Sequence, residues 1–196
     1  MTQFDTLAKA KELGFEAIEF TDIDRKEDYA LQTENARKLR LEADRLGMEI
    51  NAYTIGGCLF QEKQESMDAE VERLERLFNA VAHDNYGLLV DMGNFLCVDE
   101  DPIHAVSRVA PYAFHVHIKD MRIKNTSIGS MMTRGGNYLK GTVVGKGDVP
   151  VKQCLQILKR IGYEGYVYLE YEGAEDCIAG ITRSLANIRQ MLSALS

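Results

Sequence analysis

The spacing of apolar residues along the chain predicts helices that alternate with short strands. Six segments place apolar residues three and four positions apart, which is the spacing of a helix with one buried face. They are residues 4–13, 29–46, 66–83, 103–109, 151–161 and 174–195, the last read as two helical segments. Five short apolar runs rich in β-branched and aromatic residues predict strands. They are residues 15–20, 48–55, 86–92, 112–118 and 166–171.

This alternation favours parallel strands, because a parallel pair needs a crossover connection and the helix between two strands provides it. No glycine-rich phosphate-binding signature follows any predicted strand, so a (β/α) barrel is favoured over an open nucleotide-binding sheet. An eight-stranded barrel takes about 250 residues, whereas this chain has 196. We therefore expect one α/β domain over residues 1–196, an incomplete TIM-barrel-like fold, with residues 120–150 as a long glycine-rich loop.

Charge and cysteine usage narrow the classes of partner. The net charge of −7 and the lack of a block rich in Lys and Arg argue against binding to nucleic acid or to an anionic membrane surface. No apolar run reaches the roughly 20 residues that a membrane span needs. The four cysteines are scattered and form no C-x-x-C pair, which is typical of free thiols in a reducing compartment. We expect a cytoplasmic protein.

Three polar residues near the ends of apolar strands are the main candidates for chemistry: Asp91, His117 and Glu170. The carboxyl ends of parallel strands meet on one face of a barrel, so these side chains can converge there. Two carboxylates and an imidazole suit Mn²⁺, Mg²⁺, Co²⁺ or Zn²⁺. The alternative interpretation is structural: Asp91 caps a turn, His117 is a satisfied core histidine, and Glu170 pairs with Lys119.

Four sequence segments resemble the xylose isomerase-like family of sugar phosphate isomerases and epimerases. They are LLVDMGNF, HVHIKD, GKGDVPVKQCLQILKRIGYEG and GYVYLEYEG, in the order and spacing of that family. The resemblance covers the carboxyl half best, from about residue 85 to residue 188. The words ELGFEAIEF and RLGMEINAYTIGG are similar to the early units of the family.

The resemblance implies a divalent metal ion bound by Asp91, His117 and Glu170. It also implies that Glu170 transfers a proton at the carbon next to a substrate carbonyl, through a metal-bound enediolate. The substrate would be a sugar or sugar phosphate. Residues around the motifs are candidates for binding or orienting it: Asn94, His115, Lys119, Asp120 and Arg122. For Lys119 and Arg122, a role as solvated surface charges is an equally good interpretation, and Glu172 is either a neighbour of the site or simply exposed.

The sequence departs from the family in ways that bear on activity. Members open with a strand, and have two further strands before the D-M-G-N segment, one of which ends in a second metal-binding glutamate. Here residues 70–81 run from one helix into a later one, and no equivalent glutamate is found. Glu19 ends a predicted strand, but capping or salt bridging is its more typical role. A homo-oligomer that completes the barrel is a hypothesis, since open sheet edges need cover.

These observations leave three functional hypotheses. The first is a metal-dependent sugar or sugar-phosphate isomerase or epimerase, whose activity the shortened framework would reduce. The second is a non-catalytic carbohydrate-binding or assembly protein derived from the same family. The third, a metal-dependent endonuclease of the same superfamily, is disfavoured by the charge of −7 and by the presence of only four histidines.

Overall fold

The computed structural model describes residues 2–21, 29–54 and 87–195. The chain divides into two compact units, residues 1–79 and residues 80–196, which are described one at a time. The helix predicted over residues 66–83 lies outside the described residues. The part of the chain in which the family has two further strands, before residue 86, also lies outside the described residues, so the loss of these strands stays a prediction.

The first unit contains two αβ repeats and its own small core. Helix α1 (Gln3–Glu12) precedes strand β1 (Ala17–Phe20), and helix α2 (Tyr29–Leu46) precedes strand β2 (Glu49–Tyr53). The two strands pair in parallel, as the alternation with helices predicted. The core is formed by apolar residues from α1, β1 and α2: Leu7, Phe20, Leu39 and Ala43.

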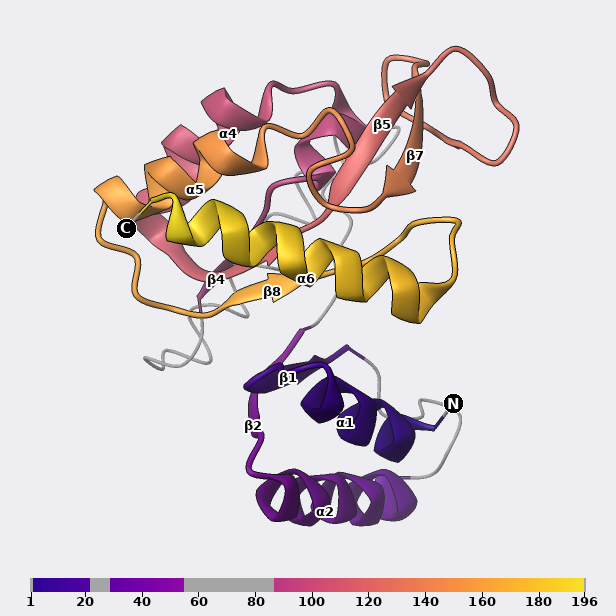
Figure 1. Ribbon diagram of the computed structural model, residues 1–196, viewed down its shortest axis with the longest axis vertical. Coiled ribbons are helices and arrows are strands. Elements are labelled where there is room, and N and C mark those ends of the chain that lie inside the picture. The colour runs from indigo at the N-terminus through magenta and orange to yellow at the C-terminus, as the bar shows by residue number, and fades with distance from the viewer. Residues whose placement is uncertain (1, 22–28, 55–86, 196) are drawn as a thin grey trace. The chain divides into compact units, whose positions relative to one another are not determined.

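The second unit is built on three parallel strands in the order β3, β4, β8. These strands are Leu88–Asp91, Ala113–Ile118 and Val167–Leu169. Helices α4 (Pro102–Val109), α5 (Val151–Arg160) and α6 (Cys177–Ser193) lie together beside β4 and β8 (Figure 1). Short 3₁₀ turns, η1 (Asn94–Val98) and η2 (Ala110–Tyr112), flank α4. Helix α6 is one continuous helix, not the two segments predicted.

One core holds this second unit together. It combines buried residues of the strands with the apolar faces of the helices, among them Val90, Val116, Ile118, Val106, Leu155 and Ile188. Val106, Val116 and Ile118 are completely inaccessible to solvent. The core residues of the strands lie on one face of the sheet. The polar residues that alternate with them along the strands therefore face the opposite side of the sheet.

The predicted long loop over residues 120–150 is wrong in part, because it contains a small antiparallel sheet. Strand β5 (Asp120–Lys124) pairs with β7 (Tyr138–Thr142), and β6 (Met131–Met132) pairs with β7. The segment DMRIK alternates charged and apolar residues, a period-two pattern that indicates a strand and that the prediction passed over. YLKGT shows no such alternation, and its pairing with DMRIK joins distant segments, which local pattern does not predict.

The expected fold class is confirmed. Five parallel strands lie in two separate sheets, and the described strands form no closed barrel. Among the described helices, none combines the length and apolar character that crossing a membrane requires.

Candidate functional site

The parallel pairing of β3 and β4 brings Asp91 and His117 side by side. The two residues are register partners, at the last position of β3 and the penultimate position of β4. Directly opposed residues of neighbouring strands point to the same face of the sheet. Both are buried, with 8% and 7% of their surface exposed. A carboxylate and an imidazole thus share a sheltered position at the carboxyl ends of two strands.

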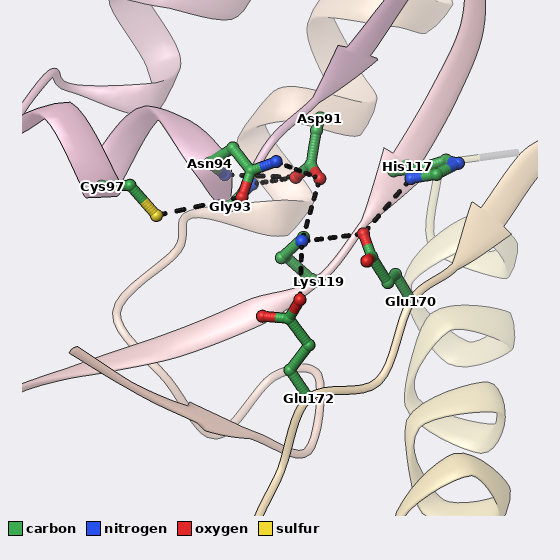
Figure 2. A network of polar contacts seen from close by, with 8 residues as sticks. All are labelled: Asp91, Gly93, Asn94, Cys97, His117, Lys119, Glu170 and Glu172. Atoms are coloured by element: carbon green, nitrogen blue, oxygen red, sulfur yellow. Dashed lines mark hydrogen bonds and ion pairs between the residues drawn. The ribbon is translucent and has the colours of Figure 1, made fainter. Parts of the chain in front are cut away.

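Glu170 reaches the same position from the third strand. His117 is the register partner of Tyr168 on β8, and Glu170 lies two residues further on, just after the strand. Because side chains alternate along extended chain, Tyr168 and Glu170 share a face. Glu170 Oε2 lies 3.3 Å from His117 Nδ1. The structure therefore gathers all three residues that the sequence singled out (Figure 2).

This group has the dimensions of a metal site. One ligand atom from each of Asp91, His117 and Glu170 lies within 4.8 Å of the other two. Three ligand atoms on one divalent ion, each about 2.1 Å from it, are separated by about 3 to 4 Å. Separations of up to 4.8 Å are slightly wider than these, and two carboxylates with an imidazole are a donor set that Mn²⁺ and Zn²⁺ accept.

A tight turn after β3 fixes the Asp91 carboxylate. Its Oδ1 accepts hydrogen bonds from the backbone N–H groups of Gly93 (2.9 Å) and Asn94 (3.1 Å), and its Oδ2 accepts one from Asn94 Nδ2 (2.9 Å). A side chain at position 93 would collide with the Lys119 stem, so this turn requires glycine. Asn94 thus holds a candidate metal ligand in place, and its predicted binding of substrate stays a prediction.

Lys119 occupies the centre of the site (Figure 2). Its Nζ lies 3.2 Å from Asp91 Oδ2, 2.8 Å from Glu170 Oε2 and 3.2 Å from Glu172 Oε1. Its side chain is only 5% exposed. The predicted alternative of a solvated surface charge is therefore wrong for Lys119. The ion pair between Glu170 and Lys119, which the structural interpretation of the sequence predicted, is present within the group of candidate metal ligands.

Charge interactions within this cluster shift several pKa values. The hydrogen bond with His117 lowers the pKa of Glu170 to about 2, against the effect of partial burial and with help from Lys119. Burial by itself would lower the pKa of Lys119, but Asp91, Glu170 and Glu172 raise it above its usual range. Burial raises the pKa of Asp91, and the Lys119 charge opposes that rise. At neutral pH the glutamate is an anion and the lysine a cation.

Two aromatic neighbours extend the same face away from the strand ends. The ring of His115 lies 5.2 Å from that of His117 and 4.3 Å from that of Tyr168, measured between centroids. His115 therefore lies beside the cluster, on the side where the prediction placed it. Tyr168 was missed from the sequence, although its alternation with Glu170 and Glu172 was the available signal.

Two other candidates from the sequence point elsewhere. Arg122 on β5 is exposed, and its guanidinium donates a hydrogen bond to the Lys146 carbonyl, away from the acidic cluster. Asp120 is buried and accepts hydrogen bonds from the backbone N–H groups of Gly145, Gly147 and Val149. Its carboxylate therefore stabilises the glycine-rich loop, and a role in orienting the site or substrate stays a prediction. Glu19 lies on β1 in the first unit.

Hydrogen bonds that the sequence did not predict join Asp99, at the end of η1, to the segment between β6 and β7. The Asp99 carboxylate accepts hydrogen bonds from Thr133 Oγ1 (2.8 Å), Asn137 Nδ2 (2.7 Å) and the Gly135 N–H (2.5 Å). These bonds tie the segment between β6 and β7 to the end of η1. The sequence carries little signal for this tether, because Asp99 reads as an ordinary turn residue.

Sequence comparison finds relatives that include inosose dehydratases. An inosose dehydratase of Clostridium perfringens is 25% identical over 152 residues, which cover 74% of this chain and 48% of that protein. The uncharacterized protein YfiH of Bacillus subtilis is 29% identical over 163 residues, which cover 76% of this chain and 51% of that protein. The chain thus spans about half the length of these relatives.

Solved structures share the fold at lower identity. A D-allulose 3-epimerase from Methylomonas sp., in complex with D-allulose, superposes with a TM-score of 0.58 at 14% identity, covering 96% of this chain and 90% of that one. A xylose isomerase-like TIM barrel protein from Mycobacterium smegmatis, in complex with magnesium, gives 0.52 at 18% identity, covering 98% and 66%. A family model described as xylose isomerase-like TIM barrel matches residues 60–194. This match covers more than half of the chain, which therefore belongs to the xylose isomerase-like TIM barrel family.

Proposed function

We propose that this chain carries the site of a divalent-metal-dependent sugar or sugar-phosphate isomerase or epimerase, which transfers a proton at the carbon next to a carbonyl. The observation that carries the proposal is the convergence of Asp91, His117 and Glu170 at the ends of three adjacent strands. The magnesium bound by the Mycobacterium smegmatis protein and the D-allulose bound by the Methylomonas epimerase support it.

Each residue of the cluster has a distinct task in this proposal. Asp91, His117 and Glu170 would hold the ion, and the Asn94 side chain keeps Asp91 in position. The bound ion supplies positive charge that stabilises the negative charge developing on the substrate oxygens. Glu170 is ionised at neutral pH, because His117 and Lys119 lower its pKa, and it would accept the proton from carbon. His115, beside His117, would supply a hydrogen-bonding partner for a sugar hydroxyl.

Dehydration is a second candidate, favoured by the sequence similarity to inosose dehydratases. When a ketone loses water, the hydroxyl leaves the β-carbon, and the reaction also begins with removal of the proton on the α-carbon next to the carbonyl. Isomerisation, epimerisation and dehydration thus share their first step, and this site would serve each of them. They differ in whether the proton returns or a hydroxyl leaves.

Solvent exchange of that proton tests the proposal and separates these outcomes. The chain is incubated with Mn²⁺ in D₂O with ketohexoses, their phosphates and an inosose, and each substrate is followed by NMR. We expect deuterium to enter next to the carbonyl of at least one substrate, and chelation of the metal to stop this entry. Inversion or loss of water then identifies the reaction. Binding of a sugar without any exchange would contradict catalysis and support the non-catalytic carbohydrate-binding alternative.

The partner predictions made from the sequence remain parts of this proposal. A small sugar or sugar phosphate is the proposed ligand, and the charge of −7 argues against nucleic acid and anionic membranes. A cytoplasmic location remains a prediction. A homo-oligomer also remains a prediction, and sedimentation of a monomer that unfolds cooperatively would argue against it.

A further inference from the structure

We infer that the Lys119 ammonium and a divalent ion compete for Asp91 and Glu170, and that Glu172 is the positioning residue that retains Lys119 when the ion binds. This inference rests on the proposed function, because it concerns the same metal site. It assigns a task to two residues outside the metal-ligating group.

The ammonium already occupies the position of a cation in the cluster. Three carboxylates surround Lys119 Nζ, at 3.2 Å for Asp91, 2.8 Å for Glu170 and 3.2 Å for Glu172 (Figure 2). An ammonium group has three N–H donors, so three acceptors satisfy it fully. Because the Lys119 side chain is only 5% exposed, water has little access to replace these three hydrogen-bond acceptors.

We call Lys119 and its three carboxylate partners the ion-pair set. Asp91 and Glu170 belong both to this set and to the candidate metal group. Asp91 Oδ1 accepts two backbone N–H groups of the following turn, whereas Oδ2 accepts only the Asn94 side-chain amide and contacts Lys119, so Oδ2 is the oxygen that a metal ion would share with the ammonium. Glu170 Oε2 likewise faces both His117 and Lys119. Two cations in contact with the same oxygens repel each other strongly in a buried site. Ion binding therefore requires the ammonium to move away from Asp91 and Glu170.

Glu172 provides the position to which Lys119 can move. It is the one carboxylate of the ion-pair set that the candidate metal group does not include. Its side chain is 46% exposed, so it has more freedom to follow the ammonium than the buried Asp91 has. A buried ammonium left without a partner would be costly. The Glu172 carboxylate therefore lowers the free-energy cost of moving the Lys119 ammonium away from Asp91 and Glu170.

Metal affinity in a double-mutant cycle tests this inference without any measurement of activity. Mn²⁺ is titrated calorimetrically into wild type, Lys119→Met, Glu172→Gln and the double variant at one pH above 7. Lys152→Met and Glu164→Gln remove the same charges at exposed positions outside the ion-pair set. Circular dichroism verifies that each variant is folded. Glu172→Gln keeps the test decisive if Lys119→Met fails to fold.

The inference predicts opposite effects for the two single variants. Lys119→Met should bind Mn²⁺ about tenfold more tightly or better, since one competing charge is removed. Glu172→Gln should bind several-fold more weakly than Glu164→Gln. In the Lys119→Met background the Glu172 effect should largely disappear, because Glu172 acts through Lys119.

The outcomes separate this inference from the proposed metal site. If wild type binds Mn²⁺ and Lys119→Met binds it no better, the competition is overturned and the metal site stands. If only Lys119→Met binds, the competition is supported and the proposed function of the native chain is contradicted. If no variant binds, both are overturned. A Glu172 effect of equal size with and without Lys119 would overturn the positioning role.

Discussion

Glu170→Gln is expected to lower the rate of proton exchange next to the substrate carbonyl by about 10²-fold or more, the range typical for removal of a general base. Glu170 is ionised at neutral pH and sits at the mouth of the cluster, with 38% of its side chain exposed. The amide of glutamine keeps the size of the side chain but cannot accept the proton. Exchange is measured by NMR in D₂O at saturating Mn²⁺.

The matched control is Glu164→Gln, which changes an exposed glutamate outside the cluster and should leave exchange unchanged. Because Glu170 is also a candidate ligand, Mn²⁺ affinity is measured on the same variant, and the rates are compared with both proteins loaded. A loaded Glu170→Gln protein that exchanges at the wild-type rate would show that another residue removes the proton.

Asp120→Ala is expected to lower the free energy of unfolding by about 3 kcal/mol, because charged hydrogen bonds are lost and a buried N–H is left unpaired. Asp120 is 3% exposed. Its carboxylate accepts from Gly145 (2.8 Å), Gly147 (2.8 Å) and Val149 (3.2 Å), and the Val149 N–H is buried. A Cβ atom at position 147 would collide with this carboxylate, so the loop is shaped around it. Urea denaturation followed by circular dichroism measures the loss.

Glu100→Ala is the comparison for Asp120→Ala, because it removes an exposed carboxylate. Its effect should stay within about 0.5 kcal/mol, as for most surface changes. An Asp120→Ala protein as stable as Glu100→Ala would contradict the structural role assigned to Asp120. It would also return Asp120 to the residues that orient the site or substrate.

The five parallel strands and the three residues of the candidate metal group could be anticipated because they depend on local pattern. Asp91, His117 and Glu170 interrupt apolar strands near their carboxyl ends, and parallel strands bring such ends together. The register of the strands then brings the three side chains together. Asp91 lies opposite His117, and Glu170 lies two positions after Tyr168, the register partner of His117 on β8. Their roles as metal ligands remain predictions.

Contacts between distant segments could not be anticipated in the same way. The position of Lys119 at the centre of three carboxylates depends on Gly93 leaving room for its stem, and a lysine after a strand reads equally well as a surface charge. Arg122 carries the charge expected of an anion-binding residue, but donates to the Lys146 carbonyl. The pairing of β5 with β7 likewise depends on backbone bonds across a long connection.

Titration of Mn²⁺ into wild type and His117→Ala tests whether Asp91, His117 and Glu170 bind a metal ion, because His117 supplies the imidazole that joins the two carboxylates in the proposed site. His104→Ala serves as the control, since His104 lies exposed on α4. We expect about one ion bound per wild-type chain, the same for His104→Ala, and loss of binding in His117→Ala. No binding by wild type, or equal binding by His117→Ala, would contradict it.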